Sequence, residues 1–187
     1  MNVDNKYRDL LDYLLEPKTY NHSGDKTICY LTFGRDDIMS VKRNLNGVWI
    51  ELAKNKNLEV TTLSIHEVLK NFFKDDEYRI EAGEYAVDDE DETTEVYHSL
   101  GENLKNQEII ENAILEAQET IDPKNGVLFI TDLEAIHPYS RFGPIEQKIY
   151  NKIKVPIVVF YPGEKSGTAL KFLGFYPEDG NYRSKHF

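Results

Sequence analysis

Apolar and polar residues follow two different periods along this chain, and the change of period predicts its secondary structure. Segments 6–15 and 107–120 place apolar residues three and four positions apart, which is typical of amphipathic helices. Segment 58–64 alternates with the period of a strand, whereas 126–131 and 155–161 are short apolar runs bounded by polar residues. The elements expected in chain order are a helix at 6–15, a strand at 28–33, a helix at 36–52, a strand at 58–64, a helix at 65–73, a helix at 107–120, a strand at 126–131, a helix at about 144–152, a strand at 155–161 and an edge strand at 170–175.

This alternation of strands and helices predicts the fold class. Strands separated by helices form a mainly parallel sheet, and right-handed crossovers place the helices on both of its faces. We therefore expect a three-layer α/β fold with a central sheet of about four to five strands. Its topology should be P-loop-like or Rossmann-like, without a phosphate-binding loop. At 187 residues the chain suits a single domain over 1–187.

The net charge of −11 is concentrated in one segment. Residues 75–95 contain 11 acidic residues and one base, Arg79, so the rest of the chain is nearly neutral. We expect an acidic, flexible insertion at about 75–105. Its run Asp88–Glu92 is interpreted either as a solvated loop held open by its own repulsion or as a docking segment for a basic partner surface. Direct binding to nucleic acid or to an anionic membrane surface is disfavoured.

The single cysteine and the lengths of the apolar segments indicate the cellular compartment in which the protein is expected. Cys29 lies within the apolar run 27–33, where a small buried side chain is the expected role. No window approaches the roughly 20 apolar residues that a membrane-spanning helix needs, and residues 1–8 do not resemble a signal peptide. We therefore expect a cytoplasmic protein without a membrane-spanning segment.

One segment resembles part of a nucleotide hydrolase. The apolar run 127–131 ends in Asp132 and Glu134, like the strand that holds magnesium in such enzymes. However, the turn at 33–37 after the first strand has one glycine, two carboxylates and no lysine, and so lacks a phosphate cradle. Lys165 lies in a second glycine-containing segment, but a short Pro-Gly turn explains that spacing without a ligand. A nucleotide- or phosphate-binding sensor or hydrolase using Asp132 and Lys165 is retained as the alternative function.

Other chemistry has less support. Asp132, Glu134 and His137 are potential metal ligands within one loop, but no second cluster completes a coordination shell. Nucleophilic catalysis lacks a Gly-x-Ser-x-Gly elbow, and Cys29 is placed within a strand rather than on an exposed turn. We therefore expect a protein that is not an enzyme, with no catalytic residues, no metal and no cofactor.

The last third of the chain carries a family resemblance. Residues 156–163 are similar to the beginning of the family's closing segment, and residues 128–131 are similar to the family's preceding strand. The matching single positions are Gly167, Leu170, Phe172, Gly174, Asn181, Tyr182, Arg183, His137, Tyr139 and Arg141. Together they resemble the BrxB family of BREX bacteriophage-defence systems. The chain departs from the family's pattern at Asp132–Glu134, where a glycine-containing turn is usual, and at its ending 184–187.

The resemblance implies a role in a multi-protein system that distinguishes self from invading DNA by methylation and blocks phage replication. BrxB-like proteins have no established catalytic motif. They resemble assembly partners of larger components, such as the alkaline-phosphatase-like PglZ protein and the BrxC ATPase. The resemblance therefore favours a non-enzymatic interaction protein that docks onto other BREX proteins.

Partner-binding residues are expected in the loops beyond the carboxyl ends of the strands, where α/β proteins place their sites. Arg141 suits a partner carboxylate, and tyrosines are rigid amphipathic contact groups. The candidates are Tyr139, Arg141, Tyr161, Gly163, Gly167, Tyr182 and Arg183. Structural alternatives stay open for most of them: Tyr161 and Tyr182 can close the core, and Gly163 and Gly167 can serve backbone turns. Arg141 can cap a helix or pair with Glu134 or Glu146.

Overall fold

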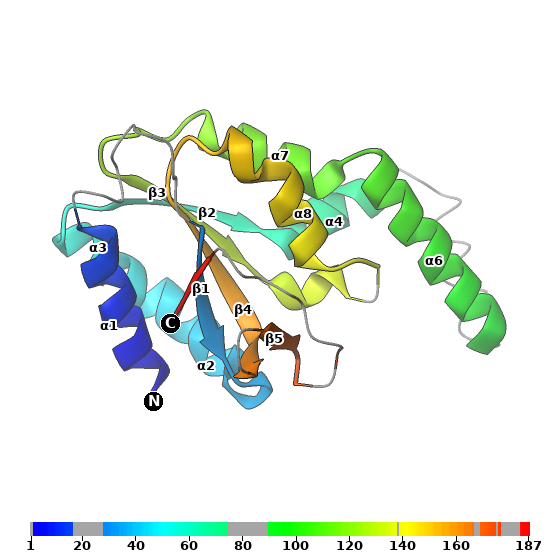
Figure 1. Ribbon diagram of the computed structural model, residues 1–187, viewed down its shortest axis with the longest axis horizontal. Coiled ribbons are helices and arrows are strands. Elements are labelled where there is room, and N and C mark those ends of the chain that lie inside the picture. Colours follow the sequence, from blue (N-terminus) through cyan, green and yellow to red (C-terminus); the bar gives the residue numbers. More distant parts are fainter. Residues whose placement is uncertain are drawn as a thin grey trace.

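The structure is a computed structural model, and it confirms the predicted α/β class (Figure 1). It describes residues 2–16, 28–74, 90–137, 139–166, 169–174, 176 and 184–187, with only the backbone at 90–94, 96, 165, 166 and 169. The strands are β1 (Ile28–Phe33), β2 (Glu59–Ser64), β3 (Gly126–Thr131), β4 (Ile157–Ser166), β5 (Ala169–Phe172) and β6 (Lys185–His186). The α-helices are α1 (Val3–Leu14), α2 (Ile38–Asn44), α3 (Ile50–Asn55), α4 (Ile65–Lys74), α6 (Glu90–Asn106), α7 (Ile109–Gln118) and α8 (Phe142–Ile149).

The strands form one sheet in the order β2-β3-β4-β1-β6, and these neighbours pair in parallel. β1 therefore lies between β4 and β6, which differs from the order 3-2-1-4-5-6 of the Rossmann fold. β5 pairs antiparallel with the last four residues of β4. The carboxyl ends of β1, β2, β3 and the parallel part of β4 consequently meet at one edge of the sheet.

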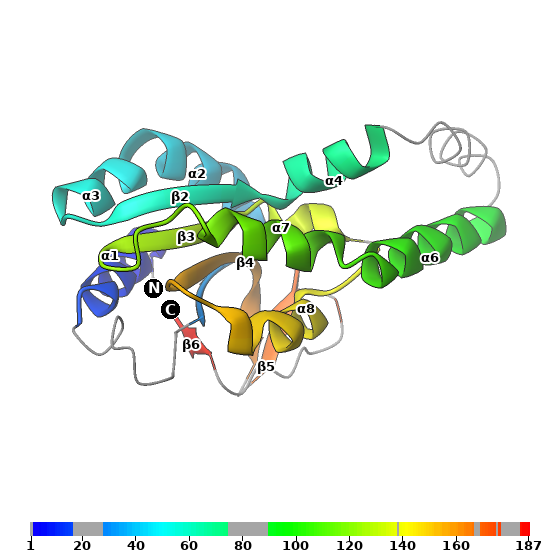
Figure 2. The same cartoon turned by 90° about the horizontal axis from the view of Figure 1, so that it is seen from above.

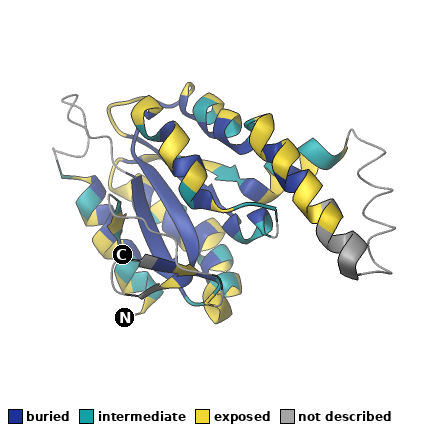
Figure 3. Cartoon of the chain, turned by 45° about the vertical axis from the view of Figure 1, so that its right-hand side comes forward, coloured by how far each residue is buried: buried dark blue, intermediate teal, exposed yellow. Residues whose placement is uncertain are grey.

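The central strands of the sheet are buried (Figure 3). Their alternate residues enter two separate cores. Ile28 and Tyr30 of β1 face a core built with α4, α7 and α8. Cys29 and Leu31 face a second core built with α1, α2 and α3. This alternation follows from the period of two in a strand, and burial on both faces explains why β1, β3 and the start of β4 are almost entirely apolar.

The helix expected at 36–52 is one continuous helical segment with several turn types. A 3-10 turn (Arg35–Asp37) precedes α2, and a π-helical turn (Leu45–Trp49) joins α2 to α3. The Tyr7 hydroxyl donates a hydrogen bond of 2.7 Å to the Trp49 carbonyl oxygen, and the two rings stack with centroids 4.4 Å apart. These contacts fix α1 against the π-helical turn.

Two expectations about local structure were wrong. Pro162 and Gly163 do not form a turn, because β4 continues through them to pair with β5. At Gly163 an added Cβ would lie 2.5 Å from the Lys171 carbonyl oxygen, so glycine permits this close strand pairing. In the acidic segment, residues from Glu90 onward form α6 rather than an open loop, whereas Asp88 and Asp89 lie outside the described residues.

α6 extends well beyond the rest of the fold, as the two perpendicular views agree (Figures 1 and 2). Leu100 and Leu104, in its second half, are buried. At Gly101 an added Cβ would collide with the backbone oxygen of Tyr139, so the helix touches the backbone of the loop after β3. The second half of α6 is thus anchored to the domain. Within the described part of the chain, none of the helices combines the length and apolar character that a membrane crossing requires.

Candidate functional site

Asp132 and Glu134 follow β3 at the carboxyl edge of the sheet, and both are paired with a lysine from α2. Lys42 Nζ lies 2.7 Å from Asp132 Oδ1 and also contacts Glu134 Oε1. The other Asp132 oxygen accepts hydrogen bonds from Ser64 Oγ at 2.6 Å and from Thr131 Oγ1 at 3.2 Å. We call these five residues the carboxyl-edge cluster. The cluster joins α2 to the ends of β2 and β3.

The cluster favours the charged forms of Asp132 and Lys42. Burial alone would raise the pKa of Asp132, but the hydrogen bonds from Lys42 and Ser64 outweigh it and lower that pKa below the ordinary value. Burial likewise opposes the charge on Lys42, but its bonds to Asp132 and Glu134 raise the Lys42 pKa overall. The carboxylates that the sequence suggests for magnesium are therefore neutralised by an internal ammonium group.

A second hollow at this edge has acidic walls. It encloses about 390 Å³ beyond the ends of β1 and β4, and Asp36, Asp37 and Glu164 line it together with Arg35. Carboxylates in this position would repel the phosphates of a nucleotide. The hollow does not resemble a phosphate cradle.

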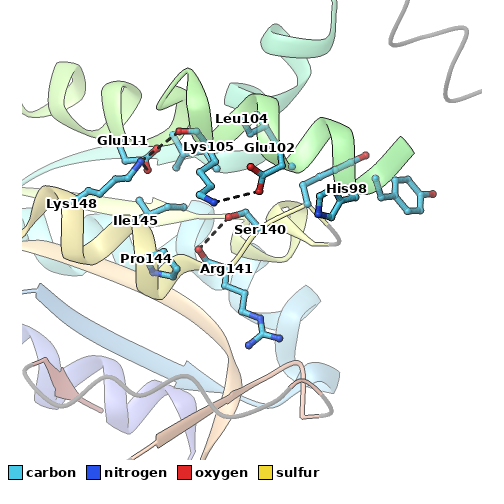
Figure 4. Close-up of a pocket in the computed structure, with 14 residues that line it drawn as sticks. His98, Glu102, Leu104, Lys105, Glu111, Ser140, Arg141, Pro144, Ile145 and Lys148 are labelled. Carbon is cyan, nitrogen blue, oxygen red and sulfur yellow. Dashed lines mark hydrogen bonds and ion pairs between the residues drawn. The ribbon is translucent and has the colours of Figure 1, made fainter. Parts of the chain in front are cut away.

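A larger hollow, of the described residues, lies between α6, α7, α8 and the loop 137–141 (Figure 4). We call it the α6–α8 groove; its volume is about 780 Å³, within the range of ligand and peptide pockets. Leu104, Ile110 and Ile145 supply buried apolar surface, and Tyr97 and Tyr139 supply aromatic surface. The aromatic rings are 5.8 Å apart and nearly perpendicular.

Two lysines of the groove are paired with glutamates. Lys148 Nζ lies 3.2 Å from Glu108 and 3.1 Å from the buried carboxylate of Glu111, and the hydrogen bond to Glu111 is the main cause of its raised pKa. Lys105 Nζ lies 3.3 Å from Glu102 on α6. Both lysines are therefore paired, and the two lysines and three glutamates together have a formal charge of −1.

Arg141 lies between the groove and a smaller hollow. The smaller hollow has a volume of about 220 Å³ and is lined by Arg141, Tyr139, Phe172 and Tyr176. Figure 4 shows the Arg141 side chain extending away from α6. Arg141 is exposed and Tyr139 is half-buried, and burial together with nearby Tyr97 raises the Tyr139 pKa. The structure therefore brings two predicted candidates together at the surface of one loop.

The other predicted candidates are placed differently. Tyr161 is 2 % exposed and packs against the rings of Tyr30 and Phe172, so it belongs to the core and not to the surface. Gly163 lies within the β4–β5 pairing. The remaining three candidates, Gly167, Tyr182 and Arg183, lie outside the described residues. The side chain of Lys165 is also outside the description, so its distance from Asp132 is not defined.

The three potential metal ligands of the loop after β3 do not converge. Asp132 and Glu134 share Lys42, whereas the ring of His137 hydrogen-bonds the hydroxyl of Tyr176. Burial lowers the pKa of His137. In the ranges that the structure describes, no group of three or more His, Cys, Asp or Glu side chains is placed to hold a metal ion.

Sequence reasoning missed Lys42, Tyr97 and Gly101. Lys42 and Asp132 are 90 positions apart and meet only when α2 packs beside β3, so no local pattern signals the pair. Tyr97 was hidden in a segment interpreted as an acidic loop. The spacing of Val96, Leu100 and Leu104, four residues apart, was the available signal that this segment forms a helix.

Comparison with known proteins identifies a family for this chain. The family model described as "BREX protein BrxB" matches residues 61–187, which is more than half of the chain and includes Asp132, Tyr139 and Arg141. Neither a curated protein nor a solved structure matches the chain. The match confirms the resemblance found in the last third of the sequence. The chain belongs to the BrxB family and is a component of a BREX defence system.

Proposed function

We propose that the protein is a non-enzymatic adaptor of its BREX system, docking onto a larger system protein through the loop 137–141 and the adjoining α6–α8 groove. The observation that carries the proposal is the position of Tyr139 and Arg141 on one surface loop, flanked by two hollows. Aromatic residues and arginine dominate the binding energy of protein interfaces. The PglZ-like alkaline-phosphatase-fold protein and the BrxC-like ATPase are the proposed partners.

The state of the carboxyl-edge cluster favours the adaptor over a nucleotide sensor or hydrolase. Asp132 is engaged by Lys42, Ser64 and Thr131, and the hollow after β1 is lined by carboxylates. A triphosphate with magnesium would have to displace an internal ion pair and approach like charges. The α6–α8 groove instead offers a protein side chain the apolar surface of Leu104, Ile110 and Ile145.

Charge reversal at Arg141 tests the proposal. Tagged protein is co-expressed with its operon neighbours, and capture of the neighbours is measured by quantitative mass spectrometry. Arg141→Glu should reduce capture about tenfold or more, because truncated or reversed arginine contacts at interfaces cost roughly 2 kcal/mol. The melting temperature should change little, since Arg141 is exposed.

Arg8→Glu is the matched control, because Arg8 is an exposed arginine on α1, which packs on the other face of the sheet. It should capture neighbours like the wild type. Undiminished capture by Arg141→Glu would contradict the docking loop. A rise in melting temperature with ATP and magnesium, abolished by Asp132→Asn, would instead support the nucleotide-binding alternative; a ligand at a hundredfold excess over its dissociation constant stabilises by about 2.7 kcal/mol.

A further inference from the structure

The first half of α6 is a feature that the docking loop alone does not explain. We propose that this half, residues 90–99, is an acidic docking arm that binds a basic surface of the partner protein. The inference rests on the proposed adaptor function and adds the chemistry of the partner. The position of the helix, its charge and its contact with the loop 137–141 support this role.

The arm has surface that the domain does not cover. Glu95, Tyr97, His98 and Ser99 are all exposed, in contrast to buried Leu100 at the point of anchorage. Figures 1 and 2 show this half of the helix extending past the sheet and the neighbouring helices. These four described side chains are therefore accessible to a partner.

The sequence of the arm offers little to stabilise it from within. Residues 90–95 read Glu-Asp-Glu-Thr-Thr-Glu, with four carboxylates and neither an apolar nor a cationic residue. A helical stretch that is polar on every side gains nothing from packing. Asp91 and Glu95 are like charges four positions apart, which disfavours the helix, although carboxylates near a helix N-terminus are stabilised by its dipole. Contact with lysine or arginine side chains would relieve this repulsion.

Tyr97 connects the arm to the docking loop. It is 38 % exposed, and its ring meets that of Tyr139, which in turn lies 5.3 Å from the ring of Phe73 at the end of α4. Three elements thus contribute to one partly exposed aromatic cluster at the base of the arm. An aromatic centre beside a charged rim is the usual composition of a protein interface, in which the charges steer association.

The charge of the arm selects among classes of partner. Phosphates of nucleic acids or of an anionic membrane would be repelled by four carboxylates. A protein surface rich in lysine and arginine is attracted, and the attraction is screened by salt. The proposed occupant is therefore a basic protein surface.

The test uses the full chain with the arm neutralised by Glu90→Gln, Asp91→Asn, Glu92→Gln and Glu95→Gln. Capture of the operon neighbours is measured from about 50 to about 300 mM NaCl, a range over which surface charges become screened. At low salt the variant should capture roughly tenfold less partner than the wild type, and its capture should depend far less on salt. Its melting temperature should stay the same or rise, because like-charge repulsion is removed.

A matched control removes four exposed carboxylates elsewhere on the molecule, by Asp9→Asn, Asp36→Asn, Glu51→Gln and Glu59→Gln. This control has the same net charge as the arm variant and should retain wild-type capture. An equal loss of capture in both variants would show that only the net charge of the protein matters, and it would overturn the proposal of a docking arm.

Unchanged capture and salt dependence in the arm variant would also overturn the inference. If Arg141→Glu still reduced capture in that case, the adaptor function would stand without the arm. Loss of wild-type capture after nuclease treatment would reject a protein surface as the occupant. Failure of the wild type to capture any neighbour would reject both proposals.

Discussion

Asp132 shows how a single residue can be held in a strained conformation. Its φ of 55° lies in the left-handed region, which costs a residue other than glycine roughly 1–2 kcal/mol. Four polar groups hold Asp132 in this conformation. They are the Lys42 ammonium, the Ser64 and Thr131 hydroxyls, and the Ala135 amide, which donates a hydrogen bond of 3.0 Å to the Asp132 carbonyl oxygen. The strained turn directs the chain into the segment that leads to the docking loop. The cluster therefore has a positioning role that does not require a ligand.

Removing the charge of Asp132 should reveal the strength of this cluster. Asparagine tolerates the left-handed conformation, so Asp132→Asn chiefly weakens the pairing with Lys42. We expect a loss of about 1–2 kcal/mol in the free energy of unfolding at pH 7, measured by urea titration. The folded-state pKa of Asp132 is lowered, so its contribution is present above the ordinary value of 3.8 and disappears as the pH falls through the folded-state pKa.

The difference between variant and wild type should accordingly narrow below about pH 4. Asp36→Asn is the control, because Asp36 is 97 % exposed and its loss should change stability by less than about 0.5 kcal/mol. A deficit in Asp132→Asn that stays constant down to pH 3 would mean that the ion pair is not its source.

Among the elements, those with a local hydrophobic signal were predictable. β1 and β3 have the predicted bounds, because both are apolar runs flanked by polar residues. The helix at 65–73 was also identified, and Ser64 caps it as expected: the Glu67 amide donates to Ser64 Oγ at 3.4 Å. For these elements, the local sequence pattern is sufficient to predict the secondary structure.

Elements determined by distant contacts were not predictable. β6 consists of Lys185 and His186, and it exists because both residues pair with β1. The continuation of β4 through Pro162 and Gly163 likewise depends on pairing with β5, which overrides the turn preference of the two residues. For the same reason the site was only partly predictable. Tyr139 and Arg141 could be identified from the position of their loop, but the groove beside them forms only when α6 packs against that loop.

The docking of α6 can be tested at Gly101. Replacing Gly101 with alanine should force the helix away from the backbone of Tyr139, since the added Cβ has no room. We expect a loss of about 1–3 kcal/mol in the free energy of unfolding, typical of overpacking, together with faster hydrogen exchange across α6. Exchange followed by mass spectrometry locates the change.

Gly47→Ala is the matched control, because a Cβ at Gly47 would meet no atom within 4 Å. That helical substitution should stabilise the protein by roughly 0.5–1 kcal/mol. If Gly101→Ala proved as stable as Gly47→Ala and left exchange in α6 unchanged, the close contact between α6 and the loop would be wrong.

At the scale of the whole molecule, a strand from the N-terminal part of the chain and a strand at its C-terminus lie side by side in one sheet. β1 pairs with β4 on one side and with β6 on the other, and all six of its residues are buried. The Tyr30 hydroxyl donates a 2.5 Å hydrogen bond to buried Glu146 on α8, and Ser184 binds the same carboxylate. β1 and the helices α1 to α3 are therefore an integral part of the fold, even though the family match begins at residue 61.

This interdependence predicts that residues 61–187 alone will not fold cooperatively. Without β1, the fragment exposes one edge of β4, leaves β6 without its strand and loses α1 to α3 from one face of the sheet. The buried surface of that face, which includes Val127, Phe129, Val158 and Phe160, would then contact water.

Circular dichroism of the fragment during heating should show a broad, non-cooperative change, in contrast to a single sharp transition for the full chain. Adding residues 1–60 as a separate chain should restore a cooperative transition if the lost strand pairing is the cause. A fragment that melts sharply on its own would show instead that the β2-to-β6 portion is an independent domain.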